Sequence, residues 1–176
     1  MHPFHKRLLK EFKSLNKNPL PSIKILSNNE NLTNFDFEIE ITNGLYDDKL
    51  YKLVVVITKE YPVSPPKAKF VVGTREAGES GSTGTSENPI DVSSDTMQSS
   101  YKIPIHPHIY SNGHICLNLL GDDWTPACTI ESILISLQSM INNNTDMTRP
   151  PDDNRYIKYA GEFASKDGFV YHDDSV

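Results

Sequence analysis

Cys116 and the histidines near it are the residues of this chain best suited to chemistry. His106, His108 and His114 all lie within ten residues of Cys116. Thiolate and imidazole are the usual ligands of zinc, but the spacing H-x-H-x5-H-x-C matches none of the common structural zinc sites. Cys128 is the only other cysteine, and it forms no close pair with Cys116. The pattern therefore disfavours a zinc site.

Two other chemistries use Cys116 as a nucleophile. In a cysteine hydrolase a histidine activates the thiol, and because its partners need not be close in sequence, this interpretation stays open. An acyl carrier instead needs an accessible thiol in a loop-rich site without a strong base aimed at water. The structural alternative is an inert buried cysteine. Turn-forming residues at Asn112-Gly113 and at Gly121 favour an exposed thiol, and with it the carrier.

The elements that must position this segment follow an α+β order. Apolar residues at helical spacing predict an amphipathic helix over residues 5–16. Alternating or β-branched segments then predict strands over residues 35–42, 50–58 and 67–72. A strong apolar stripe predicts a helix over residues 130–141 with Thr129 as its N-cap, and a weaker pattern predicts a helix over residues 154–164.

Composition and charge limit the class of protein. The longest apolar run, residues 53–57, is far below the roughly 18 residues of a membrane span. Two cysteines exclude a disulfide scaffold and indicate an intracellular protein. Six of the basic residues lie in residues 1–24 of a chain with net charge −6, which suits one acidic protein surface or a solvated helix face rather than nucleic acid. We expect one domain over residues 1–176, with a flexible low-complexity insertion at 74–101 and partial order at 149–176.

Several motifs resemble those of ubiquitin-conjugating enzymes. Their active-site signature is resembled by three strings of this chain: His106-Pro107-His108, Asn112-Gly113-x-Ile115-Cys116-Leu117 and Trp124-Thr125-Pro126-Ala127. Tyr61-Pro62-x-x-Pro65-Pro66 resembles their proline loop, and Gly44-Leu45-Tyr46-Asp47 the turn between their first two strands. The His-Pro-His string, Arg149-Pro150-Pro151-Asp152 and Tyr171-His172-Asp173-Asp174 resemble the W-type members, which modify protein N-termini. The resemblance implies an N-terminal helix, a four-stranded antiparallel meander, a central helix and a weaker C-terminal helical segment.

The resemblance also implies a mechanism. Cys116 would accept ubiquitin from the activating enzyme as a thioester and transfer it to an amine, with ATP used by the activating enzyme and no cofactor held by this chain. His108 stands where most members have an amide that stabilises the oxyanion or shapes the site. Asn118 stands where lysine-directed members often have aspartate. Because lysine at pH 7 must lose a proton held with a pKa of about 10.4, against about 8 for an α-amine, a weakly deprotonating site should favour N-termini.

The partners follow from the same resemblance. The helix that contacts the activating enzyme in family members corresponds to the segment that contains Lys6, Arg7 and Lys10. The surface for RING or U-box ligases corresponds to Val63, Pro65, Pro126 and Ala127, although an aromatic residue usually occupies the position of Val63. We expect ubiquitin and proteins with flexible N-termini as further partners, no nucleic acid or membrane, and a location in the cytoplasm or nucleus. A carrier for another ubiquitin-like modifier, or a non-catalytic ubiquitin-binding adaptor, is the alternative.

Overall fold

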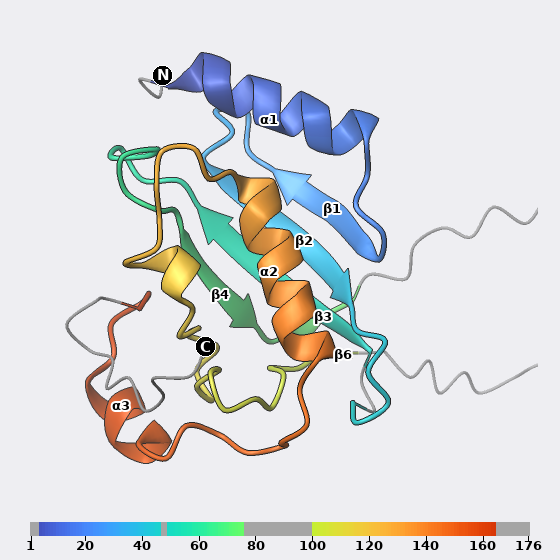
Figure 1. Cartoon of the computed structure of the whole chain (residues 1–176), viewed down its shortest axis with the longest axis vertical. Coiled ribbons are helices and arrows are strands. Elements are labelled where there is room, and N and C mark those ends of the chain that lie inside the picture. Colours follow the sequence, from blue (N-terminus) through green and yellow to red (C-terminus); the bar gives the residue numbers. More distant parts are fainter. Residues whose placement is uncertain (1–3, 47–48, 76–99, 165–176) are drawn as a thin grey trace, which may run out of the picture.

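A four-stranded antiparallel sheet forms the centre of the protein (Figure 1). The computed structural model describes residues 4–46, 49–75 and 100–164. The sheet strands follow one another in chain order and are β1 (Ile23–Asn28), β2 (Asn34–Glu40), β3 (Leu50–Val56) and β4 (Lys67–Val71). The helices are α1 (His5–Lys17), the 3-10 helix η1 (Asn118–Leu120), α2 (Ile130–Asn142) and α3 (Asp153–Tyr159). The predicted α+β order, with a four-stranded meander, is confirmed.

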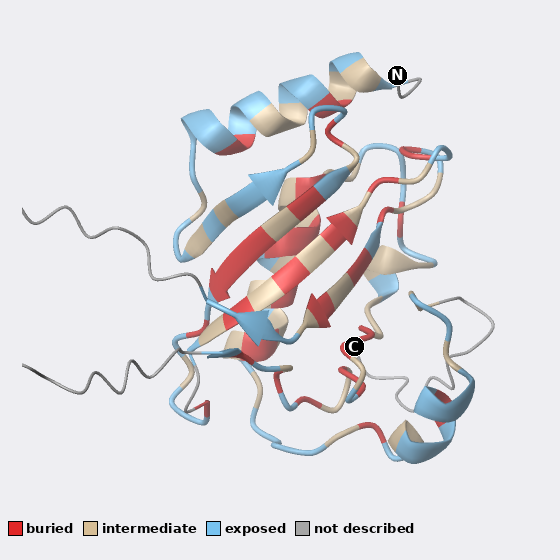
Figure 2. Ribbon diagram, turned by 180° about the vertical axis from the view of Figure 1, so that it is seen from behind, coloured by how far each residue is buried: buried red, intermediate tan, exposed pale blue. Residues whose placement is uncertain are grey.

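The core lies between the sheet and α2. Alternate residues of β2, Phe35, Phe37 and Ile39, are fully buried, as are Leu134 and Leu137 of α2. Because successive side chains of a strand point to opposite faces, one face of the sheet supplies this apolar layer. Figure 1 shows α2 lying across that face, and Figure 2 shows the alternation of buried and more exposed residues along the central strands. None of the helices in the described ranges is long and apolar enough to cross a membrane.

The predicted N-cap of α2 is confirmed. The Thr129 hydroxyl accepts a hydrogen bond from the Ser132 amide, and the Ser132 hydroxyl accepts one from the Thr129 amide. This reciprocal capping satisfies two amides that the first turn of a helix leaves without partners. Glu131 adds a negative charge in the first turn, at the positive end of the helix dipole. The cap therefore fixes where α2 begins, directly after the segment that contains Trp124.

Two predictions about secondary structure were wrong in detail. The residues alone did not predict β1, so the turn at residues 44–46 joins the second and third strands rather than the first two. The last helix was expected to reach residue 164, but α3 ends at Tyr159. Ala160 has an extended backbone, with ψ of 135°, and Gly161 follows it with a low helix propensity.

The ends of the predicted insertion pair with each other. Gly73–Thr74 (β5) and Ser100–Tyr101 (β6) form a two-stranded antiparallel ladder, anchored by the carboxylate of Glu38 on β2. This carboxylate accepts hydrogen bonds from Tyr101 Oη at 2.5 Å and Arg75 Nε at 3.1 Å. Residues 76–99, on which the prediction of a flexible insertion depends, lie outside the described residues, as do residues 165–176 of the C-terminal segment.

Candidate functional site

The segment around Cys116 folds into a short antiparallel ladder. Ile109 and Ile115 form its bridge, the Cys116 amide donates to the His108 carbonyl at 2.8 Å, and the Tyr110 amide donates to the His114 carbonyl at 2.9 Å. Because side chains alternate across a strand, the buried Ile109 and Ile115 point into the core. The side chains of His108, Tyr110, His114 and Cys116 therefore share the opposite face of the ladder.

Gly113 makes the turn of this ladder possible. Its φ is +86°, a conformation that L side chains rarely adopt, and a Cβ atom there would lie 1.9 Å from the Phe70 carbonyl oxygen. The close approach is used for a hydrogen bond, since the Phe70 amide donates to the Gly113 carbonyl at 2.9 Å. Asn112 Oδ1 accepts from the His114 amide at 3.1 Å and closes the turn. The ladder is thus fixed against β4.

Helix α3 covers the face that carries Cys116. The rings of Tyr110 and Tyr156 stack with their centres 3.9 Å apart, and Tyr110 Oη donates to Asp152 Oδ1 at 3.1 Å. The Ser111 amide donates to Asp153 Oδ1 at 2.7 Å. Asp152 and Tyr156 were not predicted as site residues. The only sequence signal was Arg149-Pro150-Pro151-Asp152, which was used for resemblance and not for chemistry.

Cys116 is half-buried, so the prediction of an exposed thiol was wrong in degree. Burial, with the negative charge of Asp152 as a second cause, raises the pKa of the Cys116 thiol to about 11. Both causes oppose the thiolate, because a buried anion loses hydration and a nearby carboxylate repels it. The thiol is therefore largely protonated at neutral pH. The Asp152 carboxylate that contributes to this shift is 36 residues from Cys116 in sequence and directly precedes α3.

The other predicted catalytic residues are His108, which pairs with Cys116 across the ladder, and Asn118, which follows Cys116 by two residues. His108 is the cross-strand partner of Cys116, is half-buried, and holds the Cys116 amide through its carbonyl. Asn118 begins η1, and its carbonyl accepts from the amides of Gly121 and Asp123 at 2.8 and 3.1 Å. The structure thus brings His108 to the thiol by backbone pairing, and it places Asn118 in the turn that follows.

The other two histidines have structural surroundings. His106 Nδ1 accepts from the His108 amide at 2.9 Å, and burial lowers the pKa of His106 to about 4. His114 is 2% exposed and contacts Tyr156 and Glu162. In the described ranges 4–46, 49–75 and 100–164, three or more His, Cys, Asp or Glu side chains nowhere gather as they would around a metal ion. His106 Nδ1 and both ring nitrogens of His114 are engaged in hydrogen bonds.

The predicted activating-enzyme residues differ from one another in structure. Lys6 and Lys10 are exposed on α1, whereas Arg7 is half-buried. The Arg7 guanidinium donates to Glu11 Oε1 at 2.8 Å and to the backbone carbonyls of Pro126 and Cys128. Glu11, which the sequence did not single out, also accepts from Tyr61 Oη at 2.7 Å. Arg7 therefore joins α1 to the segment before α2.

The predicted ligase-binding residues lie on two loops that touch. Trp124 Nε1 donates to the Pro62 carbonyl at 2.8 Å, and the Trp124 side chain is buried, so this residue packs between the two loops. Val63 is 72% exposed, and Pro126 and Ala127 are also exposed. Pro65 is half-buried beside a groove of about 260 Å³.

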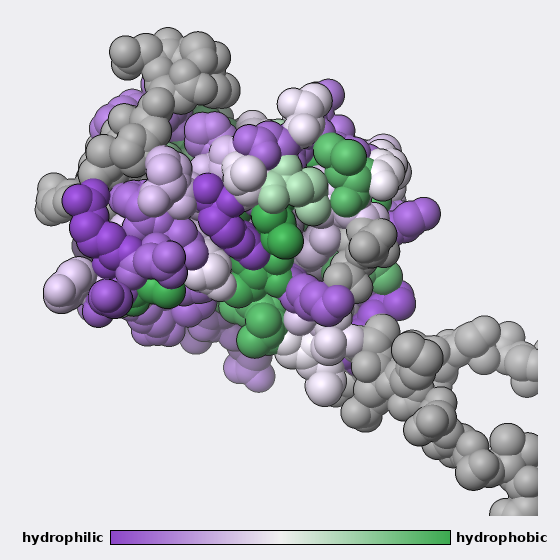
Figure 3. Space-filling model, turned by 90° about the horizontal axis from the view of Figure 1, so that it is seen from below, coloured by the Kyte–Doolittle hydropathy of each residue, from purple (hydrophilic) through white to green (hydrophobic). Residues whose placement is uncertain are grey.

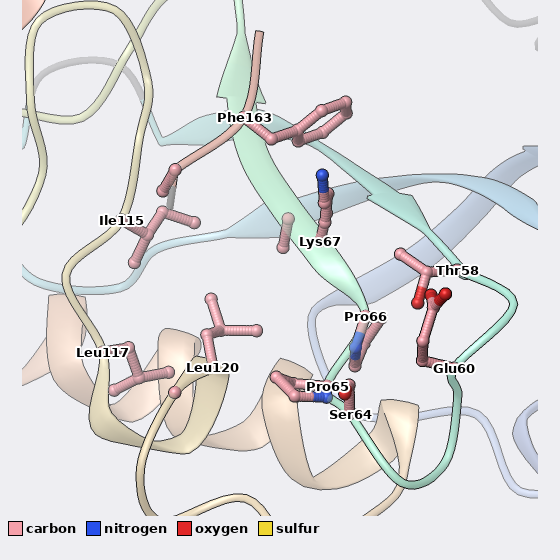
Figure 4. Close-up of a pocket in the computed structure, with 13 residues that line it drawn as sticks. Thr58, Glu60, Ser64, Pro65, Pro66, Lys67, Ile115, Leu117, Leu120 and Phe163 are labelled. Atoms are coloured by element: carbon pink, nitrogen blue, oxygen red, sulfur yellow. The ribbon is translucent and has the colours of Figure 1, made fainter. Parts of the chain in front are cut away.

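That groove is separate from the thiol. Figure 4 shows Leu117 and Leu120 on one wall, the proline loop on another, and Phe163 lying above Lys67. Ile115 and Leu117 line the groove, so by alternation the intervening Cys116 side chain points away from it. Figure 3 shows, on the lower side of the molecule, one band of apolar side chains between hydrophilic flanks. The reacting atoms therefore belong to the α3 side of the ladder.

Comparison with known proteins gives one family. The family model described as "Ubiquitin-conjugating enzyme" matches residues 7–167. A probable ubiquitin-conjugating enzyme E2 W from Dictyostelium discoideum is 34% identical over 98% of this chain and 97% of its own length. The ubiquitin-conjugating enzyme E2 W of Caenorhabditis elegans is 32% identical over 97% and 96%. The crystal structure of the ubiquitin-conjugating enzyme E2 UbcA1 from Agrocybe aegerita has a TM-score of 0.71 at 27% identity, covering 93% of this chain and 99% of that one.

Proposed function

We propose, on the premise that the chain belongs to the ubiquitin-conjugating enzyme family, that Cys116 carries ubiquitin as a thioester. In the first transfer the Cys116 thiolate attacks the ubiquitin C-terminal carbonyl on the activating enzyme. The new bond to Sγ forms, the bond to the activating enzyme's sulfur breaks, and that sulfur leaves as a thiolate which takes up a proton. The observation that carries the proposal is the ladder that presents Cys116 beside His108 and under α3.

The raised pKa of Cys116 suits a carrier. A thiolate with a pKa of about 11 is scarce at neutral pH but is a poor leaving group, so water displaces it slowly. Asp152 disfavours the thiolate, but it has no such effect on the neutral thioester once the acyl group is attached. The same negative charge attracts the ammonium of an acceptor. The site is thus arranged to hold the thioester until an amine arrives.

In the second transfer an amine replaces the thiol. A neutral amine nitrogen attacks the thioester carbonyl, the C–N bond forms, the C–S bond breaks, and Cys116 leaves as a thiolate that takes up a proton. Presenting lysine as a free amine at pH 7 costs about 4.6 kcal/mol, against about 1–1.4 kcal/mol for an α-amine. Asn118 provides no carboxylate, and Asp152 shares its oxygens with Tyr110 and Arg155. These features support a preference for protein N-termini.

The activating enzyme and a ligase are the other proposed partners. Lys6 and Lys10 present positive charge on one exposed face of α1, which suits an acidic surface. The two touching loops that contain Val63 and Pro126 offer a surface for a RING or U-box ligase. Valine in place of an aromatic residue forfeits about 1 kcal/mol of apolar burial. Ligase binding should therefore be weaker than in relatives with the aromatic residue.

A single-round discharge assay tests the proposal. The protein is charged with activating enzyme, ATP and ubiquitin, and then chased with two peptides while intact mass is followed without reducing agent. One peptide has a free N-terminus and no lysine, and the other has a blocked N-terminus and one lysine. Transfer to the first alone supports both the carrier role and the N-terminal preference. Equal transfer to both removes the preference, and a Cys116→Ala variant that still forms a thiol-sensitive adduct removes the assignment of Cys116.

The alternatives are a carrier for another ubiquitin-like modifier and a non-catalytic ubiquitin-binding adaptor, which would form no thioester with any modifier. Exposed charges on α1 do not distinguish modifiers, because each activating enzyme selects its partner through detailed surface contacts. The same charging reaction, run with a different modifier and the activating enzyme of that modifier, tests which modifier the protein carries. A thioester formed with that modifier and not with ubiquitin would replace the proposal.

A further inference from the structure

His114 is a buried histidine that uses both ring nitrogens, two residues from Cys116. Nδ1 lies 2.9 Å from Tyr156 Oη, and Nε2 lies 3.1 Å from the Glu162 carbonyl oxygen. A carbonyl oxygen only accepts, so Nε2 carries the proton and Nδ1 accepts from the Tyr156 hydroxyl. Burial raises the pKa of Tyr156 to about 12, so this hydroxyl keeps its proton at neutral pH. The imidazole is therefore held as one neutral tautomer.

Tyr156 continues this connection to the thiol. Its ring stacks on Tyr110, whose hydroxyl donates to Asp152 Oδ1 at 3.1 Å, and the charge of Asp152 acts on Cys116. The Asp152 carbonyl accepts from the Tyr156 amide at 2.9 Å, at the start of α3. Asp152 therefore moves with the helix. Any contact that holds α3 against the ladder containing His114 and Cys116 therefore also fixes the distance from Asp152 to Cys116.

Two other attachments of α3 and the residues after it are more exposed. The Ser111 amide donates to Asp153 Oδ1 at 2.7 Å, and Lys69 Nζ donates to the Glu162 carbonyl at 3.0 Å. Both bonds are accessible to water, whereas the contact between His114 and Tyr156 is buried. Figure 1 shows α3 set apart from the packed layers of the sheet and α2. Of these three contacts, the one between His114 and Tyr156 is therefore the least accessible to water.

We propose that His114 is a positioning residue for the second transfer. It fixes α3 on the loop and so holds Asp152 beside the Cys116 thioester, where the carboxylate receives the ammonium of the acceptor. This inference rests on the proposed function, because it concerns the acceptor side of the same site. His114 itself touches neither the thioester nor the acceptor and acts through Tyr156.

Two substitutions and one matched control test this role. His114→Ala removes both ring contacts, and Tyr156→Phe removes the hydroxyl while keeping the stack on Tyr110. Tyr159→Phe removes a hydroxyl from the same helix whose side chain is 86% exposed. Each charged variant is discharged with a lysine-free peptide over a range of concentrations, and separately with hydroxylamine. Hydroxylamine is uncharged at pH 7 and needs no carboxylate to receive it.

We expect charging and hydroxylamine discharge to be at least as fast as in the unsubstituted protein for all three variants, because moving Asp152 away makes the Cys116 thiolate easier to form and a better leaving group. Peptide discharge by His114→Ala and Tyr156→Phe should fall about 3- to 10-fold, the effect of one lost hydrogen bond, mainly through a higher half-saturating peptide concentration. The double variant should be no slower than the worse single variant, because both changes break one contact. His114→Gln keeps a donor for Glu162 and should recover part of the loss. Tyr159→Phe should discharge normally.

Three results would overturn the positioning role: normal peptide discharge by His114→Ala, an equal loss with hydroxylamine, or fully additive effects in the double variant. A second readout needs no ubiquitin. Moving Asp152 away lowers the pKa of Cys116, so His114→Ala should be alkylated by iodoacetamide at pH 8 several-fold faster, and an unchanged rate counts against the role. Failure of the unsubstituted protein to form a thioester overturns the proposed function instead.

Discussion

Replacing Arg7 by alanine should destabilise the fold, although Arg7 belongs to the basic segment predicted to bind the activating enzyme. Its guanidinium bonds to Glu11 and to the carbonyls of Pro126 and Cys128, and it lies 5.3 Å from the centre of the Tyr61 ring. These contacts join α1, the proline loop and the segment that leads into α2. Truncation to alanine removes all of them at once.

The magnitude follows from the groups left behind. The Pro126 carbonyl is exposed and regains water, whereas the Cys128 carbonyl is partly buried. Glu11, with a side chain 11% exposed, keeps Tyr61 Oη at 2.7 Å and the Ile130 amide at 3.0 Å but loses its cation. A lost hydrogen bond to a charged group costs about 1.5–3 kcal/mol, so the total loss should be about 2–3 kcal/mol. With a urea m-value of about 1–3 kcal/mol per M, the midpoint falls by about 0.7–3 M.

Lys6→Ala is the matched control, since it removes the same charge from the same helix at an exposed position. Its unfolding midpoint in urea, followed by circular dichroism, should stay within the range of about 0.5 kcal/mol expected for surface changes. Equal midpoints for Arg7→Ala and Lys6→Ala would refute the structural role of Arg7. Binding of the activating enzyme is then tested by charging rates of Lys6→Glu and Lys10→Glu, which leave the Arg7 contacts intact. An unchanged rate would mean that these lysines only keep α1 solvated.

Two further predictions concern titration. A contact with Thr125 lowers the pKa of Cys128, whereas burial raises that of Cys116 to about 11, so iodoacetamide at pH 7.5 should label Cys128 first by peptide mass mapping. Faster labelling of Cys116 would contradict the burial argument. Burial lowers the folded-state pKa of His106 from 6.5 to about 4, so between these pH values His106 is protonated in the unfolded chain and neutral in the folded chain. The free energy of unfolding should therefore fall by on the order of 3 kcal/mol as the pH is lowered from 6.5 to 4. His106→Gln should flatten this part of the urea-denaturation profile, and an unaltered profile would show that other groups cause the loss.

Local signals decided which elements the sequence predicted correctly. The apolar stripe and the cap at Thr129 are contained in one short segment, so α2 was predicted within one residue at its C-terminal end. The β1 strand was not, because it is an edge strand with largely exposed residues, and its conformation comes from pairing with β2. The end of α3 was predicted too late, because the apolar pattern continues past the extended Ala160 and Gly161 that end the helix. Asp152 is 36 residues from Cys116, so spacing gave no sign that its charge acts on the thiol.

The three histidines near Cys116 show how burial gives one residue type three different roles. His106 accepts a hydrogen bond from the His108 amide and stays neutral, which shapes the loop. His114 donates to Glu162 and accepts from Tyr156, which fixes α3. His108 is half-buried and is the cross-strand partner of Cys116. Of the three, we therefore expect His108 to take part in proton transfer or to stabilise an oxyanion at Cys116. Its substitution should alter the chemistry, whereas substitution of the other two should alter the shape of the site.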